Sequence, residues 1–289
     1  MKPFTIYHLF YHSFLSVQQS LVNIIVKEAA PNLIYLLGAS ISRRRTESIF
    51  QQSAPSSHQI SSCFLFILMQ DLANKETHDW QDKLENNCKA LMPVTIIVLQ
   101  KSSFEEWLNN GHPFATSVQQ TAPVIYKSGK FDLPNCILSN NEEQIKSLEK
   151  FHLDGLIKSK EFYAGSELFR IRKQHAMAAF MLHQCVEQSL RTILKIGTGY
   201  HANTHSIDRL IRYTGLVSYQ LPDVFPQNTE IEKRLFCLLQ KAYIDPRYKE
   251  DYRIANDDLL QLTEKAQQII TIVSEVGKQI LSSMRSTLS

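Results

Sequence analysis

Apolar runs and amphipathic segments alternate along the first half of the chain. A short, continuous apolar run bounded by polar residues is typical of a strand covered on both faces. Such runs predict strands over 32–40, 63–69, 94–99 and 124–126. Apolar residues at helical spacing predict helices over 13–29, 43–50, 77–90, 103–110 and 116–120. This alternation of strands and helices indicates a small α/β domain over residues 1–138.

Helical periodicity takes over in the second half. Asn140 and Glu143 have the spacing of a capping box, as do Thr229 and Glu232, and each pair predicts a helix start. Between them we expect helices over about 172–196 and over 204–213, the latter capped by Thr204. The final helix carries an apolar stripe made of Leu259, Leu262, Ala266, Ile269, Val273, Val276 and Ile280. Residues 139–289 therefore read as an all-α, antiparallel helical bundle.

Composition narrows the classes of protein. The 31 basic and 28 acidic residues leave a net charge of +3, which is too small to drive nonspecific nucleic-acid binding without a local basic patch. The five cysteines are scattered and form no Cys-x-x-Cys pair, as expected of reduced thiols. The first thirty residues fit neither a signal peptide nor a membrane span. We expect a soluble, cytoplasmic protein without a membrane partner.

Aromatic and charged residues concentrate between Lys241 and Arg253. Pro246 forbids a regular helix through the middle of this stretch, so the cluster is expected where one helix ends. Two interpretations stay open. The side chains either tie down a buried corner or bind an anionic ligand, with arginine gripping a phosphate and tyrosines stacking on a base. The candidate ligand-binding residues are Tyr243, Asp245, Arg247, Tyr248 and Tyr252.

The second half resembles a HEPN domain (higher eukaryotes and prokaryotes nucleotide-binding). Three segments in order carry the resemblance: 179–187, Thr198-Gly-Tyr200 with Thr204-His205, and Ala242-Tyr-Ile-Asp-Pro-Arg-Tyr248. The resemblance implies a homodimer and a nucleotide ligand such as ATP or GTP, or RNA. It also implies a toxin–antitoxin or stress-response setting, with a partner antitoxin or toxin.

The first half resembles the minimal nucleotidyltransferase domain that is often fused to HEPN domains. The resemblance rests on the Leu36-Leu-Gly38-Ala-Ser40 turn, the strand 63–69, and Gly111-His-Pro-Phe114 leading to 124–126. Nucleotidyl transfer requires carboxylates that hold two metal ions, and the family carries them as Asp-x-Asp. Here the strand ends with Asp71 alone, so we expect a degenerate domain without a metal site, unless Asp79 or Asp82 contributes.

A phosphate site remains an option at the predicted turn. Backbone N–H groups at a helix start bind phosphate, which makes Gly38, Ser40 and Arg43 candidates. The alternative is that the arginines at 43–45 are a solvated helix start.

Ribonucleases of the HEPN family use an Arg followed four to six residues later by His, paired across a dimer. After Arg247 the matching positions hold Tyr252, Arg253 and Ile254, so the histidine is missing. Arg170 and His175 have the spacing elsewhere, as an alternative catalytic pair. His183 and Glu187 lie one helical turn apart, a spacing that favours a structural tie. We therefore expect a protein that binds nucleotide or nucleic acid without the usual catalysis; the alternatives are an RNA-cleaving toxin with a non-standard site and a pure protein-interaction module.

Overall fold

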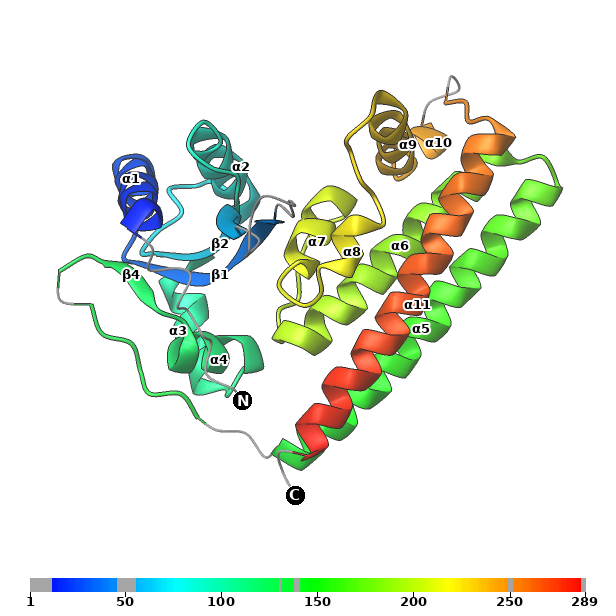
Figure 1. Ribbon diagram of the computed structural model, residues 1–289. Coiled ribbons are helices and arrows are strands. Elements are labelled where there is room, and N and C mark those ends of the chain that lie inside the picture. The colour runs from blue at the N-terminus through cyan, green and yellow to red at the C-terminus, as the bar shows by residue number, and fades with distance from the viewer. Residues whose placement is uncertain (1–11, 46–55, 130, 138–140, 249–251, 287–289) are drawn as a thin grey trace, which may run out of the picture. The chain divides into compact units, whose positions relative to one another are not determined.

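The chain folds into two compact units, Met1–Ser139 and Asn140–Ser289. The computed structural model, drawn in Figure 1, describes residues 12–45, 56–129, 131–137, 141–248 and 252–286. At residues 12–14, 43–45, 56–59, 141, 247 and 248 the description covers the backbone alone. Among the described helices, none combines the length and apolar character needed to cross a membrane.

A four-stranded mixed sheet forms the centre of the first unit. Its strands are β1 (Leu33–Arg45), β2 (Ser56–Met69), β3 (Val94–Gln100) and β4 (Val124–Lys127), in the order β3-β2-β1-β4. Strand β2 pairs antiparallel with β1 and parallel with β3, while β4 pairs antiparallel with β1. All four predicted strands are therefore present, and β1 and β2 are longer than predicted.

Helices cover both faces of this sheet (Figure 1). One face packs under α1 (His12–Ala29) and α2 (Thr77–Cys88) through a core that includes Ile25, Leu65 and Leu84. On the other face, Phe66 contacts Phe104 of α3 (Lys101–Asn109) and Phe114 of α4 (Pro113–Thr121). Successive residues of a strand point to opposite faces, which explains why the run from Cys63 to Met69 is continuously apolar.

The helix predicted over 43–50 is wrong where the structure describes it. Strand β1 continues to Arg45, and Arg43, Arg44 and Arg45 pair with residues of β2. Gly38 marks an irregularity in the register between these strands and not a turn. An apolar run that ends in Gly-Ala-Ser suggested a turn, but pairing with β2 satisfies the backbone groups and carries the strand onward. Residues 46–50 lie outside the described part of the chain.

Three long helices dominate the second unit: α5 (Asn141–Ile171), α6 (His175–Thr198) and α11 (Asn256–Ser286). They pack against one another along their lengths, as Figure 1 shows. Shorter helices fill the connection between α6 and α11, namely α7 (Ile207–Thr214), α8 (Gln220–Asp223), α9 (Glu230–Lys241) and α10 (Asp245–Tyr248). The predicted helical character of this half is confirmed.

One of the predicted helix caps is confirmed and another is wrong. The capping box of Thr229 and Glu232 is confirmed at the start of α9. Helix α7 is capped by Ser206, whose hydroxyl accepts from the Arg209 N–H at 3.3 Å, and not by Thr204. The predicted stripe of the final helix is buried from Leu259 to Val273.

Two glycines allow the long helices to approach closely. A Cβ at Gly155 of α5 would collide with the side chain of Thr192 on α6, and one at Gly277 of α11 would collide with His152 on α5. The imidazole of His152 is buried, and its Nε2–H donates to the Val273 carbonyl of α11 at 3.2 Å. This hydrogen bond ties the first long helix to the last.

The His152 contact predicts a loss of stability in mild acid. Burial lowers the pKa of His152 below its ordinary value of 6.5, with the hydrogen bond to Val273 opposing the effect. The unfolded chain therefore binds this proton more readily, and the free energy of unfolding falls as pH drops below about 6.5. Thermal unfolding of wild type and His152→Gln between pH 8 and 5 checks this. The variant should lose less stability over that range than wild type, and an equal loss would contradict the assignment.

Candidate functional site

A buried carboxylate, Glu187, connects the groups that form the candidate site in the helical unit. His183, Glu187 and Arg191 lie at intervals of four residues on α6, so they share one face of that helix. The Glu187 side chain is only 8% exposed, and its Oε1 lies 3.0 Å from the Arg191 Nε. Its Oε2 lies 3.7 Å from the His183 Nδ1. A carboxylate removed from water in this way needs charged or hydrogen-bonding partners.

The same carboxylate binds His205, in the loop that follows α6. The Nδ1 of His205 and the Oε1 of Glu187 are 3.0 Å apart. Because a carboxylate only accepts hydrogen bonds, this contact places the proton on Nδ1. The Nε2 is then an acceptor in the neutral ring and a donor in the charged ring. The side chain is 54% exposed, so the buried carboxylate orients a ring that reaches solvent.

Arg191 holds the loop that carries His205. Its Nη2 donates to the carbonyl oxygen of Thr204 at 2.7 Å, while its Nε pairs with Glu187. One guanidinium therefore fixes both the carboxylate and the backbone next to His205. The loop begins at Gly199, which ends α6 in a left-handed conformation (φ 75°) that favours glycine.

Tyr243, just after α9, completes the cluster. Its ring stacks on that of His205, with centroids 4.6 Å apart and planes 14° from parallel. It also stacks on the buried His183 ring, at 5.2 Å and 29°. Aromatic contacts of this kind contribute about 0.5–1.5 kcal/mol beyond the burial of area. Tyr243 therefore joins the chain after α9 to the Glu187 cluster.

The carboxylate retains an unused acceptor. Among the described residues, the Oε2 of Glu187 is buried and has no hydrogen-bond partner, since 3.7 Å from His183 is too long for a hydrogen bond. The cluster thus combines a half-exposed aromatic surface, an imidazole with a defined proton position and a buried acceptor. The half-exposed His205 ring can stack on a base and bind a polar atom of a ligand, while the buried carboxylate holds the ring in place.

The residues predicted to bind ligand have different surroundings in the structure. Tyr243 belongs to the cluster, whereas Tyr252 is 7% exposed and its hydroxyl donates to the Leu238 carbonyl at 3.1 Å. Burial raises the pKa of Tyr252, which acts as the tie at a corner and not as a stacking face. Asp245 begins α10. The side chains of Arg247 and Tyr248 lie outside the described part of the structure, so their roles stay predictions.

Within the single chain, the two residues of the alternative catalytic pair make separate contacts. Arg170 donates twice to Glu167, from Nε at 3.1 Å and from Nη2 at 2.8 Å. His175 begins α6, and among the described residues no hydrogen bond or ion pair joins it to Arg170. Arg170 therefore serves an intrahelical ion pair. His183 and Glu187, predicted to form a structural tie, are part of the candidate site.

The residues of the α/β unit that were predicted to bind phosphate or metal lie in other structural elements than expected. Gly38, Ser40 and Arg43 lie within β1, so the helix start on which the phosphate prediction rested is absent there. Asp71 accepts from the Ala73 N–H at 3.1 Å in a turn, and Asp79 accepts from the Glu76 N–H at 3.2 Å at the start of α2. Within the described ranges, no group of three or more His, Cys, Asp or Glu side chains could hold a metal ion.

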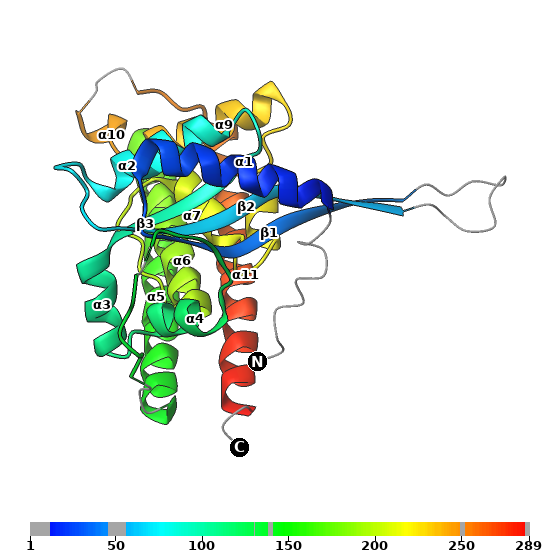
Figure 2. The ribbon, with the colours of Figure 1, turned by 90° about the vertical axis from the view of Figure 1, so that its left-hand side faces the viewer.

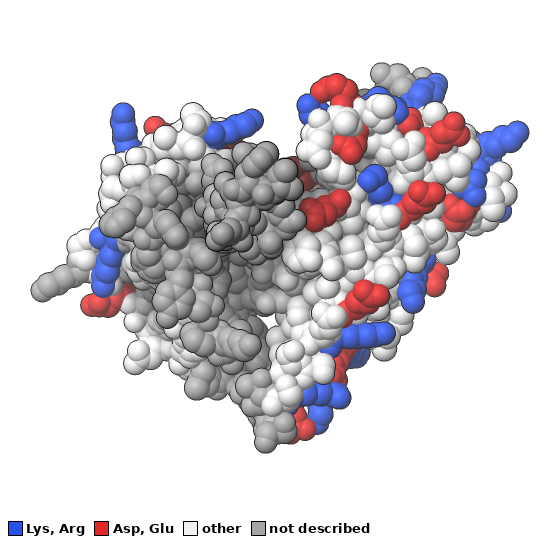
Figure 3. Space-filling model, viewed as in Figure 1, with Lys and Arg blue, Asp and Glu red and all other residues white. Residues whose placement is uncertain are grey.

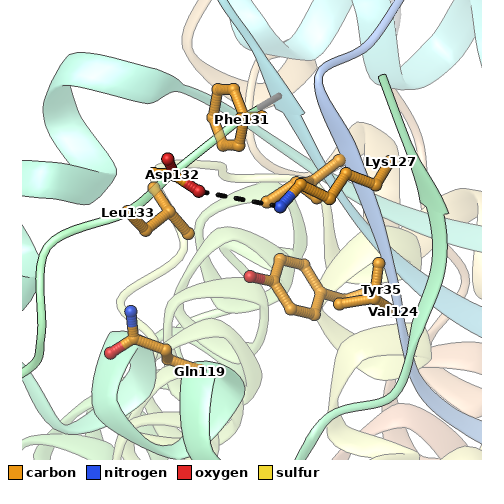
Figure 4. A pocket seen from close by; sticks show the side chains of 8 residues that line it. Tyr35, Gln119, Val124, Lys127, Phe131, Asp132 and Leu133 are labelled. Carbon is orange, nitrogen blue, oxygen red and sulfur yellow. Dashed lines mark ion pairs between the residues drawn. The ribbon is translucent and has the colours of Figure 1, made fainter. Parts of the chain in front are cut away.

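A pocket of about 380 Å³ lies beside β4 in this unit (Figure 4). It is lined by Leu33, Tyr35, Gln119, Val124, Lys127, Phe131, Asp132 and Leu133. The Lys127 Nζ and the Asp132 Oδ1 are 3.8 Å apart, and their side chains are 47% and 95% exposed. These charges pair with each other at the surface, which gives the pocket no strong preference for a charged ligand.

The helical unit matches a known family. A family model described as HEPN domain matches residues 154–276, so this part of the chain is similar to HEPN domains. The match includes α6, the His205 loop and Tyr243. A search of curated proteins found no match to the chain.

Proposed function

We propose that the HEPN-like domain binds a nucleotide or single-stranded RNA at the surface formed by His205 and Tyr243. The observation that carries the proposal is the half-exposed His205 ring, which stacks on Tyr243 at 4.6 Å and is oriented by a buried carboxylate. An exposed aromatic surface held in one orientation binds bases through stacking, which is tolerant of sequence. Little conformational entropy is lost on binding because the rings are already fixed.

Polar groups next to this surface supply further contacts. The Nε2 of His205 donates to a phosphate when the ring is charged, and it accepts from a base amino group when the ring is neutral. From the sequence alone we also propose phosphate binding by Arg247, because a guanidinium forms bidentate contacts with phosphate. On the face shown in Figure 3, basic and acidic side chains of the helical unit are interspersed, so net charge on that face adds little to the attraction of an anion. Local contacts, more than net charge, support the proposal.

For the α/β unit we propose a nucleotidyltransferase-like scaffold that has lost its metal-binding carboxylates. Asp71 and Asp79 each accept a hydrogen bond from a nearby backbone N–H, so they stabilise local turns. A homodimer and a toxin–antitoxin or stress-response setting belong to the same proposal and rest on the resemblance to the HEPN group.

Titration of ATP, GTP and a labelled single-stranded RNA tests the proposed site. Stacking on one base contributes about 1–3 kcal/mol, so Tyr243→Ala should weaken binding about 5- to 150-fold. Arg247→Ala should also weaken it, whereas Tyr219→Ala should not, because Tyr219 is a 75% exposed tyrosine outside the cluster. Circular dichroism of each variant checks that the unit remains folded.

The same samples separate the alternatives. RNA that is shortened without added metal would instead favour an RNA-cleaving protein, and His175→Ala would then show whether Arg170 and His175 are responsible. Negligible binding of all three ligands by wild type would exclude the proposal and favour a protein-interaction module.

A further inference from the structure

The two longest strands of the α/β unit extend beyond its sheet as a two-stranded ribbon. Strand β3 pairs with β2 only over Cys63–Met69, and β4 pairs with β1 only over Leu33–Tyr35. Ser42–Arg45 and Ser56–Gln59, hereafter the ribbon, therefore pair with each other, and no other strand of the described ranges pairs with them. Figure 2 shows the two strands projecting past α1.

The ribbon has little to stabilise it as part of a folded core. Isolated two-stranded hairpins are marginal in water unless a hydrophobic face packs against something. At the base of the ribbon, Ile41 pairs with Ile60 and is already 43% exposed. Beyond this pair every ribbon residue is polar or charged. A polar ribbon that contributes nothing to the core suggests a binding role.

The charge of the ribbon has one sign. It contains Arg43, Arg44 and Arg45 and no acidic residue. Arg43 is paired with His58 in the register of the two strands. Successive residues of a strand alternate between faces, which places Arg43 and Arg45 on one face of the ribbon and Arg44 on the other. Each face of the ribbon therefore carries at least one arginine position.

Composition and width point to the kind of anion. The ribbon has no Phe, Tyr, Trp or Leu and His58 is its one aromatic residue, so it has few rings that stack on single-stranded bases and no apolar residue that enters a membrane surface. Arg, Ser and Gln are residues that contact phosphates and base edges of duplexes. The major groove of B-form DNA is about 12 Å wide and admits a two-stranded ribbon, whereas the major groove of duplex RNA is too narrow.

We propose that the ribbon binds duplex DNA, with Arg43, Arg44 and Arg45 neutralising phosphates along a groove. This site is separate from the one proposed in the HEPN-like domain and does not depend on it. It also replaces the phosphate site expected at a helix start. The three arginines keep a role with phosphate, now on an extended two-stranded arm.

Fluorescence anisotropy with a 20-base-pair DNA of mixed sequence tests the proposal over a series of salt concentrations. The variant replaces Arg43, Arg44 and Arg45 with glutamine in the full chain. Each neutralised phosphate contributes about 0.9 to the slope of log K against log salt, so the slope should decrease by up to about 2.7. At low salt the affinity should fall at least about tenfold.

Two controls make the result specific. Lys150, Lys158 and Lys160, exposed on α5, can be replaced with glutamine to remove the same charge elsewhere, and this variant should bind DNA like wild type. Replacing the three arginines with lysine should restore most of the salt slope. No binding of DNA by wild type, an unchanged slope in the glutamine variant, or equal binding of duplex RNA or anionic vesicles would overturn the proposal. Nucleotide binding in the HEPN-like domain should be unaffected by any ribbon variant, which keeps the two proposals distinguishable.

Discussion

Replacing Glu187 with alanine is expected to reduce the free energy of unfolding of the helical unit by about 3–5 kcal/mol, the usual cost of removing one partner of a buried ion pair. Glu187 is 8% exposed and Arg191 is 19% exposed. Without the carboxylate, the guanidinium stays desolvated without a counter-charge. The His205 loop also loses its contact with α6, so the stacking surface should be lost together with stability.

Glu187→Gln separates the effect of losing the negative charge from the effect of losing the side-chain volume. Glutamine preserves the volume of the side chain and one acceptor oxygen but removes the negative charge, so it should cost less than alanine while still weakening the His205 contact. Urea unfolding followed by far-UV circular dichroism measures both variants, since the helical unit carries the longest helices. An unfolding midpoint for Glu187→Ala equal to that of wild type would show that the cluster is not a structural tie.

Phe66→Ala should have an effect of similar size on the other unit. Phe66 is fully buried, and its ring lies 5.1 Å from Phe104 and 5.4 Å from Phe114 between ring centroids. Removal of a buried phenylalanine costs about 3–5 kcal/mol through lost transfer energy and the remaining cavity. The variant should therefore loosen the packing of α3 and α4 on the sheet.

Tryptophan fluorescence reports on this unit alone, because both tryptophans of the chain, Trp80 and Trp107, lie in it. Phe66→Ala should shift the urea midpoint measured by fluorescence. Leu91→Ala, at a side chain that is 47% exposed in the same unit, should change it by less than about 0.5 kcal/mol. Equal midpoints for Phe66→Ala and wild type would contradict the assignment of Phe66 to the core.

Local patterns in the sequence predicted most of the architecture. Continuous apolar runs marked the strands because the sheet is covered on both faces, and apolar stripes marked the long helices. The extension of β1 through Arg45 could not be predicted from its own residues, because it depends on pairing with β2 across an intervening segment.

The candidate site was only partly predictable. His183, Glu187 and Arg191 share a four-residue spacing that a reading of α6 could find. The contacts of Glu187 with His205 and of His205 with Tyr243 join residues far apart in the chain, and they depend on how the loop after α6 and the end of α9 fold back. Tyr252 lies in the same tyrosine-rich stretch, 241–253, as Tyr243, but its side chain is buried and its hydroxyl donates to the Leu238 carbonyl. The sequence showed that tyrosines concentrate over residues 241–253, but which of them are accessible depends on the packing of the folded chain.

Ultraviolet crosslinking of a single-stranded RNA to the full chain, with the crosslinked peptides identified by mass spectrometry, tests the central claim most directly. Stacking of a base on the site predicts crosslinks at His205 or Tyr243, and these should disappear in competition with unlabelled RNA. Crosslinks found only outside residues 154–276, or crosslinks that Tyr243→Ala leaves unchanged at all positions, would contradict binding at this surface.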